Sequence, residues 1–139
     1  MIVVDTNVLS EAMRERPELR VVAWLKQQPV EETFTTVITK AEVLYGIELL
    51  PHGKNRAALT KAAESIFAET FSGRVLAFEE GSARYYAEIA ATRRARGRPI
   101  EHPDAEIAAI ARLHGATLAT RNARDFADCG VRVVNPWEA

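Results

Sequence analysis

The sequence has only one cysteine, Cys129, among its 139 residues. A single thiol cannot form a disulfide within the chain, so we expect a protein of a reducing compartment. The sequence also lacks an excess of charge, because 18 basic and 19 acidic residues leave a net charge of −1. A near-neutral chain argues against a broad basic surface that would grip nucleic acid without preference, although a local basic patch stays open.

Long apolar runs are missing as well. Residues 1–5 reach a carboxylate at Asp5, so they contain neither the basic region nor the apolar segment of a signal peptide. The apolar stretch 107–111 is far shorter than the roughly 18 residues that a membrane-spanning helix needs. We therefore expect a soluble, cytoplasmic protein that does not contact the membrane.

What is present is typical of one globular domain. The chain is 47% hydrophobic and 27% charged, and its length is close to the common domain size of roughly 100–150 residues. Expected strands are 2–4, 33–36, 74–78, 117–119 and 132–134, and expected helices begin near residue 8 and cover 19–28, 37–50, 57–71, 79–96 and 103–114. Gly97 is placed to end the helix before it. This alternation predicts a single three-layer α/β/α domain over residues 1–139, with a central, mostly parallel sheet of four to five strands.

Three acidic residues lie where expected strands end or where an expected helix begins. Asp5 directly follows the first expected strand, Asp125 follows strand 117–119, and Asp104 opens the helix 103–114. Sites in parallel sheets form beyond the carboxyl ends of the strands. We therefore expect these side chains to gather at one edge of the sheet.

Glu42 is predicted to project from an apolar face of its helix. On a helical wheel it lies among Ile38, Tyr45 and Leu49, and Asp104 likewise faces the packed side of its own helix. Burying unpaired carboxylates is costly, and one divalent cation can compensate several of them together. A set of oxygen ligands without a Cys-His cluster suits Mg²⁺ or Mn²⁺ better than zinc.

Each acidic residue also has a simpler explanation. Asp5 can cap a helix or form an Asx-turn, and Asp104 can complement a helix dipole. Glu42 alone can be a paired glutamate, and Asp125 alone can lie in a solvated turn. The expected convergence of all four is what favours a metal site.

Four motifs follow one another along the chain. They are Val3-Val4-Asp5-Thr6-Asn7, Ala41-Glu42, Asp104-Ala105-Glu106-Ile107, and Thr120-Arg121-Asn122 with Asp125-Phe126. In this order and spacing they resemble the motifs of PIN-domain ribonucleases, in particular the VapC toxins of bacterial toxin–antitoxin pairs in their FitB-like branch. The resemblance covers essentially the whole chain, including Asn135-Pro136-Trp137 near its end.

The resemblance implies roles for individual residues. Asp5 and Asp104 correspond to the principal Mg²⁺-binding aspartates, and Glu42 to the acidic residue that completes or orients the metal site. Asn122 stands where many members have a fourth acidic residue, and Asp125, three residues further on, is the candidate to replace it. Residues expected to contact the metal ligands or the substrate are Thr6, Thr120, Asn122 and Arg121.

The activity that the resemblance implies is Mg²⁺-dependent, with Mn²⁺ as a substitute. Such an endoribonuclease hydrolyses RNA phosphodiester bonds with metal-activated water and leaves a 3′-hydroxyl and a 5′-phosphate. Mechanisms with one ion and with two ions both fit. The resemblance also implies a cognate VapB- or FitA-like antitoxin and a homodimer.

Other function classes fit the residues less well. A noncatalytic interaction module on the same scaffold is the alternative, and metal binding without nuclease activity would favour it. A phosphotransfer or receiver domain would need the second aspartate of an Asp-x-Asp motif, which Asp5-Thr6-Asn7 lacks. A nucleotide-binding domain would need a glycine-rich loop after the first strand, and none is present.

The basic cluster Arg93-Arg94-Ala95-Arg96-Gly97-Arg98 has three interpretations. It can be a solvated helix end, a guide for the RNA backbone, or a receptor for an acidic antitoxin segment. Residues expected to be structural, exposed or at an interface rather than catalytic are His52, His102, His114, Trp24 and Trp137.

Overall fold

Five short strands form one sheet at the centre of the protein. In the computed structural model, which describes residues 1–139, they are β1 (Ile2–Val4), β2 (Thr33–Thr36), β3 (Val75–Leu76), β4 (Thr117–Ala119) and β5 (Arg132–Val134). All neighbouring strands are parallel, and the strand order is β3-β2-β1-β4-β5. The fully parallel sheet agrees with the expected α/β/α class, because parallel strands require helical crossovers.

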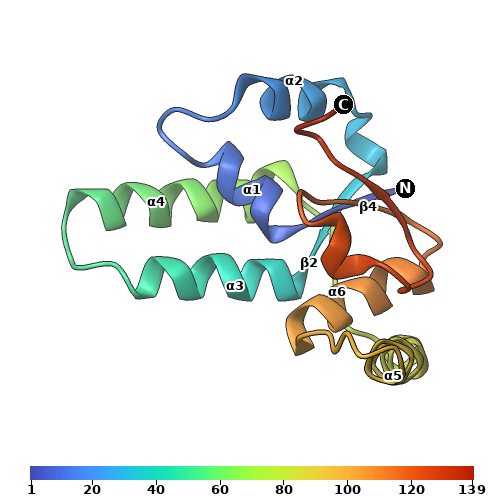
Figure 1. Ribbon diagram of the computed structural model, residues 1–139. Coiled ribbons are helices and arrows are strands. Elements are labelled where there is room, and N and C mark those ends of the chain that lie inside the picture. The colour runs from blue at the N-terminus through green and yellow to red at the C-terminus, as the bar shows by residue number, and fades with distance from the viewer.

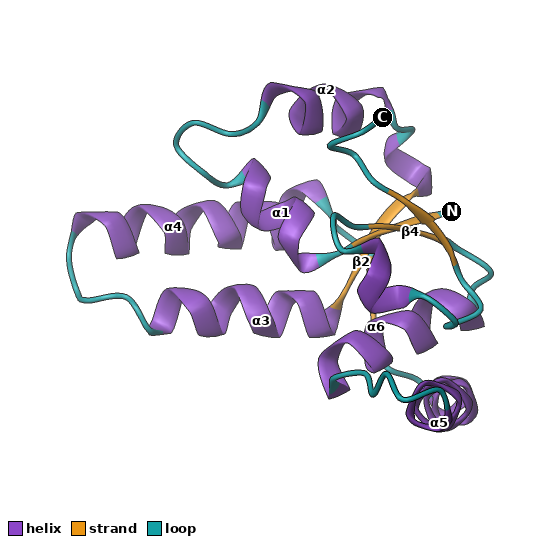
Figure 2. Cartoon of the chain, viewed as in Figure 1, coloured by secondary structure: helices purple, strands orange, loops and turns teal.

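Helices cover both faces of this sheet, and the strands lie between them (Figure 2). They are α1 (Thr6–Ala12), α2 (Leu19–Gln27), α3 (Val37–Glu48), α4 (Lys54–Ser65), α5 (Glu80–Ala95) and α6 (His102–Leu113), with the short helical segments η1 (Val30–Glu32), η2 (Ile66–Thr70) and η3 (Ala123–Phe126). Helices α1 and α2 lie on one side of the sheet and α5 and α6 on the other, while α3 and α4 run side by side away from it (Figure 1). No helix is both long and apolar enough to cross a membrane.

The sheet separates two apolar cores. Successive residues of β1 point to opposite faces, so Val3 packs in the cluster that contains Ile89 and Ile107. Val4 packs in the other cluster, with Val8. Helix α6 is buried from Ala105 to Ala111 except at Glu106, whereas Asp104 in its first turn is only half-buried.

The strand order places a topological switch point beside β1. The chain adds β2 and β3 on one side of β1 and then crosses over to add β4 and β5 on the other side. Ligand sites in open parallel sheets form at this crevice, beyond the carboxyl ends of the strands. Asp5 follows β1 and Thr120 follows β4, so both residues lie at the switch point.

Most predicted elements are confirmed, with two corrections to their bounds and one element that was not predicted. The strand expected over 74–78 is only Val75–Leu76, an edge strand that pairs with β2 alone. The helix expected over 57–71 begins at Lys54 and finishes as the π-turn η2. The segment expected to be a plain loop around Asp125 is the 3₁₀ helix η3.

The prediction that Glu42 shares a packed face with Tyr45 and Leu49 is wrong. Tyr45 is 65% exposed and Leu49 68% exposed, whereas the buried stripe of α3 contains Val43 and Ile47. The helical wheel grouped apolar residues by angle, but the neighbouring elements cover a different side of α3. Glu42 lies beside the buried stripe and is half-buried.

A candidate metal centre at the carboxyl edge of the sheet

Asp5 is the most enclosed acidic residue at the switch point, with only 4% of its surface exposed. Its Oδ1 accepts a hydrogen bond from the backbone N–H of Thr6 at 2.7 Å. Its Oδ2 accepts from the Thr120 hydroxyl at 2.7 Å and from the Asn7 amide at 3.2 Å. Burial raises the pKa of Asp5, and the Thr120 and Thr6 hydrogen bonds only partly oppose that rise.

Thr6 connects this residue to α3. The Thr6 hydroxyl donates to Glu42 Oε1 at 2.7 Å, and its Oγ1 lies 3.1 Å from Thr39 Oγ1. Thr39 is fully buried and its backbone N–H is capped by Thr36. The Glu42 carboxylate is therefore held toward the end of β1 by a hydroxyl on α1.

Asn7 and Thr120 join the ends of β1 and β4. The Asn7 amide donates to Thr120 Oγ1 at 3.1 Å, and Asn7 Oδ1 accepts from the backbone N–H of Arg121 at 3.2 Å. Thr120 Oγ1 also accepts from the backbone N–H of Asn122 at 3.2 Å. Because the Thr120 hydroxyl donates to Asp5 and accepts from Asn7 and Asn122, this network fixes the orientation of the Asp5 carboxylate.

Asp104 has a different environment. It lies in the first turn of α6 and is half-buried, but its carboxylate forms none of the hydrogen bonds or ion pairs that orient Asp5. Burial, together with the negative charges of Asp5, Asp125, Glu42 and Glu101, raises its pKa to about 7. A carboxylate without a donor, surrounded by like charge, is poised for a cation.

Asp125 approaches the same place from η3. It contributes to the raised pKa of both Asp5 and Asp104, and it lines a pocket of about 250 Å³ together with Glu101, Asp104 and Arg93. The side chain of Asp125 makes no hydrogen bond, whereas its backbone carbonyl does. The structure therefore brings Asp125 together with Asp5, Glu42, Asp104 and Glu101, which we call the acidic group. Asn122 contributes its backbone N–H to Thr120 and no carboxylate.

The acidic group fits a hard divalent cation by charge and by donor type. Asp5, Glu42, Asp104, Asp125 and Glu101 form no ion pair with a basic side chain, and all their donors are oxygen atoms. As the side chains stand, no three His, Cys, Asp or Glu residues lie close enough together to bind one metal ion. The side chains of Asp104 and Asp125 make no hydrogen bonds, so none has to be broken for these two carboxylates to turn toward an ion.

The arginine cluster divides into one buried arginine and three exposed ones. Arg93 is only 5% exposed and donates to backbone carbonyls of the η3 segment. Arg96 and Arg98 both bind the Asp128 carboxylate, at 2.6 and 2.8 Å. Arg94 is also exposed, and it is the one arginine of the cluster whose side chain has neither a hydrogen-bond partner nor an ion-pair partner.

Arg121 and the histidines lie outside the acidic group. The Arg121 guanidinium lies 5.0 Å from the ring centroid of Trp137, and Trp137 packs against one of the two cores. His102 hydrogen-bonds to Tyr86, and His52 lies beside Arg56. None of these side-chain contacts involves a carboxylate of the acidic group; His52 and His102 were expected to have structural or exposed roles, whereas the expected contact of Arg121 with the metal ligands or the substrate stays a prediction.

Two participants were missed by the sequence argument. Glu101 precedes α6 and adds a fifth negative charge beside Asp104; its spacing of one helical turn before Asp104 was an available signal. Arg93 was grouped with a surface cluster, and no periodicity of α5 distinguishes it. Its burial depends on how η3 folds over the end of α5.

The comparisons with known proteins agree with this architecture. The PIN domain family matches residues 2–131. The chain is 41% identical over 137 residues to Toxin FitB of Neisseria gonorrhoeae, and 38% identical over 138 residues to VapC ribonuclease Y4jK of Sinorhizobium fredii; each match covers 99% of both chains. The crystal structure of FitAcB from Neisseria gonorrhoeae superposes with a TM-score of 0.93 at 40% identity, covering 100% of both chains.

Proposed function

Because the chain belongs to the PIN-domain family, we propose that it is a Mg²⁺-dependent endoribonuclease and the toxin of a toxin–antitoxin pair. The observation that carries the proposal is the Asp104 carboxylate, which is half-buried, lacks a donor and has a pKa of about 7. It lies at the switch point with Asp5, Glu42 and Asp125. A group of carboxylates at this place suits hydrolysis of a phosphodiester, whose negative charge needs a cation beside it.

Asp5, Asp104 and Glu42 would hold the ion, with Asp125 in the fourth position. When bound, Mg²⁺ or Mn²⁺ supplies an activated water molecule and neutralises charge on the scissile phosphate. Thr120 and Asn7 keep the Asp5 carboxylate in one orientation, and Thr6 does the same for Glu42. Positioning of this kind lowers the cost of organising the site during the reaction.

Cleavage of RNA by the purified protein tests the proposal. We expect cleavage with Mg²⁺ or Mn²⁺, loss of cleavage in EDTA, and products that carry 5′-phosphates. Asp104→Asn should lower the rate at least about a hundredfold, since it removes a metal ligand. Asp104 makes no hydrogen bond that the variant would break, so folding is expected to survive.

Glu88→Gln is the matched control, because Glu88 is an exposed carboxylate on α5 that pairs with Arg112. It should cut RNA at the wild-type rate. Full metal-dependent activity in an Asp5→Asn/Asp104→Asn double variant would overturn the assignment. Metal binding by calorimetry without cleavage of any RNA would instead favour the noncatalytic interaction module.

A groove beside the acidic group supports an antitoxin partner. It has a volume of about 380 Å³, lies between α1, α3 and α4, and is lined by Met13, Val43, Ile47 and Leu59 with Glu42 at its margin. We propose that a segment of a VapB- or FitA-like antitoxin binds there. A peptide in this position would block access to Glu42, which is the simplest way to inhibit the site.

We also propose that the protein is a homodimer. Helix α3 exposes Leu44, Tyr45 and Leu49, with 37%, 65% and 68% of their surfaces accessible. Neighbouring exposed apolar residues on one helix are typical of an interaction surface. None of the three lines the groove proposed to bind the antitoxin, so the two proposed surfaces use different side chains of this helix.

A further inference from the structure

The segment that carries Asp125 has little regular structure of its own. It connects β4 to β5, contains only the short 3₁₀ helix η3, and its residues 121–125 are exposed. The Asp125 side chain makes no hydrogen bond, although it lines the pocket next to Asp104. Within the segment, the neighbouring Phe126 is buried in a core and the backbone N–H of Asp125 bonds to the carbonyl of Asn122, and a contact from outside the segment adds to these anchors.

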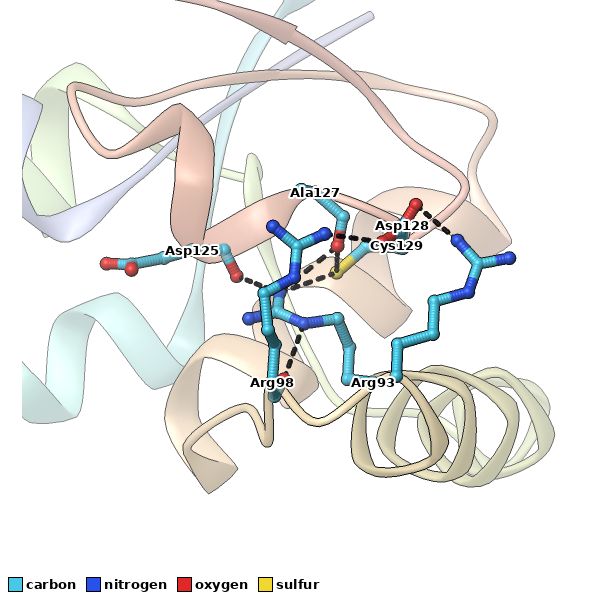
Figure 3. Close-up of polar contacts among 7 residues, drawn as sticks. Arg93, Arg98, Asp125, Ala127, Asp128 and Cys129 are labelled. Atoms are coloured by element: carbon cyan, nitrogen blue, oxygen red, sulfur yellow. Dashed lines mark hydrogen bonds and ion pairs between the residues drawn. The ribbon is translucent and has the colours of Figure 1, made fainter.

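Arg93, in the last turn of α5, makes that connection. Its Nη1 donates to the backbone carbonyl of Asp125 at 2.6 Å and to that of Ala127 at 3.1 Å, and its Nε donates to the carbonyl of Arg98 at 2.8 Å. Figure 3 shows the guanidinium among these carbonyls, while the Asp125 carboxylate points away from it. The bonds thus hold the backbone of Asp125 and leave its side chain free.

This use of an arginine is unusual because the charge is buried. Arg93 is 5% exposed and forms no ion pair with any carboxylate. A buried charge must be compensated, and several carbonyl dipoles do so only while the segment keeps its shape. The rigid, forked guanidinium can satisfy carbonyls of Asp125 and Ala127 together with that of Arg98, which a single ammonium group cannot do with the same fixed geometry.

A second contact reinforces the first. Arg96 and Arg98 hold the Asp128 carboxylate from the same end of α5, and this pairing lowers the pKa of Asp128. These two arginines are more than half exposed, so water screens their pairing with Asp128. The buried Arg93 is the firmer of the two connections.

We propose that Arg93 is a positioning residue that holds the backbone of Asp125 so that its carboxylate stays beside Asp104. The inference rests on the proposed ribonuclease function and adds a residue to that site. Arg93 is not itself a catalytic residue, because the hydrogen bonds that it makes go to groups of this chain. It links the end of α5 to the acidic group through η3.

Arg93→Met tests the role, because it keeps an unbranched apolar stem in place of that of arginine and removes the guanidinium donors. We expect amide hydrogen exchange in residues 122–130 to become at least about tenfold faster, and kcat for RNA cleavage to fall roughly 10- to 100-fold with KM little changed. Arg84→Met is the matched control: Arg84 is exposed on the same helix, and its side chain forms no hydrogen bond or ion pair. It should change neither measurement.

A double-mutant cycle separates positioning from a general loss of structure. If Arg93 acts through Asp125, Arg93→Met should change kcat less than about twofold when Asp125 is already replaced by Asn. An equal loss in both backgrounds would overturn the proposal. So would wild-type exchange rates in residues 122–130 of the Arg93→Met protein.

Arg93→Lys serves if the methionine variant does not fold. It keeps the charge but reaches fewer carbonyls, so we expect exchange and kcat between those of wild type and those of a complete loss of the contact. A fully active Arg93→Lys with wild-type exchange would show that charge alone matters, which contradicts the proposal. If wild-type protein cleaves no RNA, the proposed function fails, while the exchange experiment still decides whether Arg93 holds the segment.

Discussion

At the scale of single residues, two aspartates of one site have opposite surroundings. Asp5 is buried and bound by Thr6, Asn7 and Thr120, whereas Asp104 is half-buried and has no donor. Hydrogen bonds keep the Asp5 carboxylate in place. The Asp104 carboxylate has no such bonds and lies half-buried beside other negative charges. Strain of this kind is common at functional sites, where stability is given up for a reactive arrangement.

The strain at Asp104 predicts a pH-dependent stability in the absence of divalent cations. Its pKa is about 7 in the folded protein, against an ordinary value of 3.8. Because the pKa of Asp104 is raised in the folded state, the contribution of this residue to the free energy of unfolding is most favourable below about pH 4 and is lost as the pH rises through 7. Asp104→Asn should therefore be more stable than wild type at pH 8. The expected difference in the free energy of unfolding is about 1–2 kcal/mol, which is less than the full pKa shift implies because solvent screens the half-exposed group.

Urea unfolding in EDTA at pH 4 and pH 8 measures this difference. At pH 4 the variant and the wild type should be nearly equal, since the carboxyl is then protonated. Glu88→Gln should show the same small effect at both pH values. A stability difference for Asp104→Asn that does not depend on pH would mean that burial and the charges of Asp5, Glu42, Asp125 and Glu101 do not raise its pKa as described.

At the scale of elements, the end of α5 determines where the arginines point. The helix ends in a Schellman motif: the backbone N–H of Arg98 bonds to the carbonyl of Arg93, and that of Gly97 to the carbonyl of Arg94. Gly97 adopts φ of 72°, in the left-handed region that favours glycine. The turn presents the Arg98 carbonyl to Arg93, so the end of the helix and the contact to η3 are one structure.

Gly97→Ala should lower the free energy of unfolding by about 1–2 kcal/mol, because a Cβ is disfavoured at this φ. Gly46→Ala is the matched control, since Gly46 lies within α3, and a Cβ there would meet nothing within 4 Å. That substitution should raise stability by up to about 1 kcal/mol through helix propensity. Thermal or urea unfolding decides the signs, and equal effects of the two substitutions would contradict this account of the helix end.

At the scale of the whole molecule, the exposed apolar residues of α3 predict self-association. Tyr45→Glu/Leu49→Glu should convert the proposed homodimer to a monomer with unchanged circular dichroism, because two charges would be buried in the interface. Sedimentation velocity measures the change. Leu19→Glu is the control, since Leu19 is 78% exposed on α2 and should leave the dimer intact. A monomeric wild-type protein would refute the proposal.

The local pattern of residues was sufficient for much of this protein. Short β-branched runs bounded by turn formers marked β1, β2, β4 and β5 within the residues where the structure has them, and the parallel sheet followed from alternation with helices. Asp5 was found because it ends β1. These features depend on neighbours in sequence and on periodicity, which a single chain displays directly.

Contacts between distant segments were decided only by the folded structure. Arg93 and Asp125 are 32 residues apart, and Thr6 and Glu42 are 36 apart, so no local pattern reports their meeting. The exposed side of α3 was misjudged for the same reason, because burial depends on which elements pack against a helix. Chemistry-bearing residues could be named from their position in the chain, whereas the residues that hold them in place depend on how the chain packs.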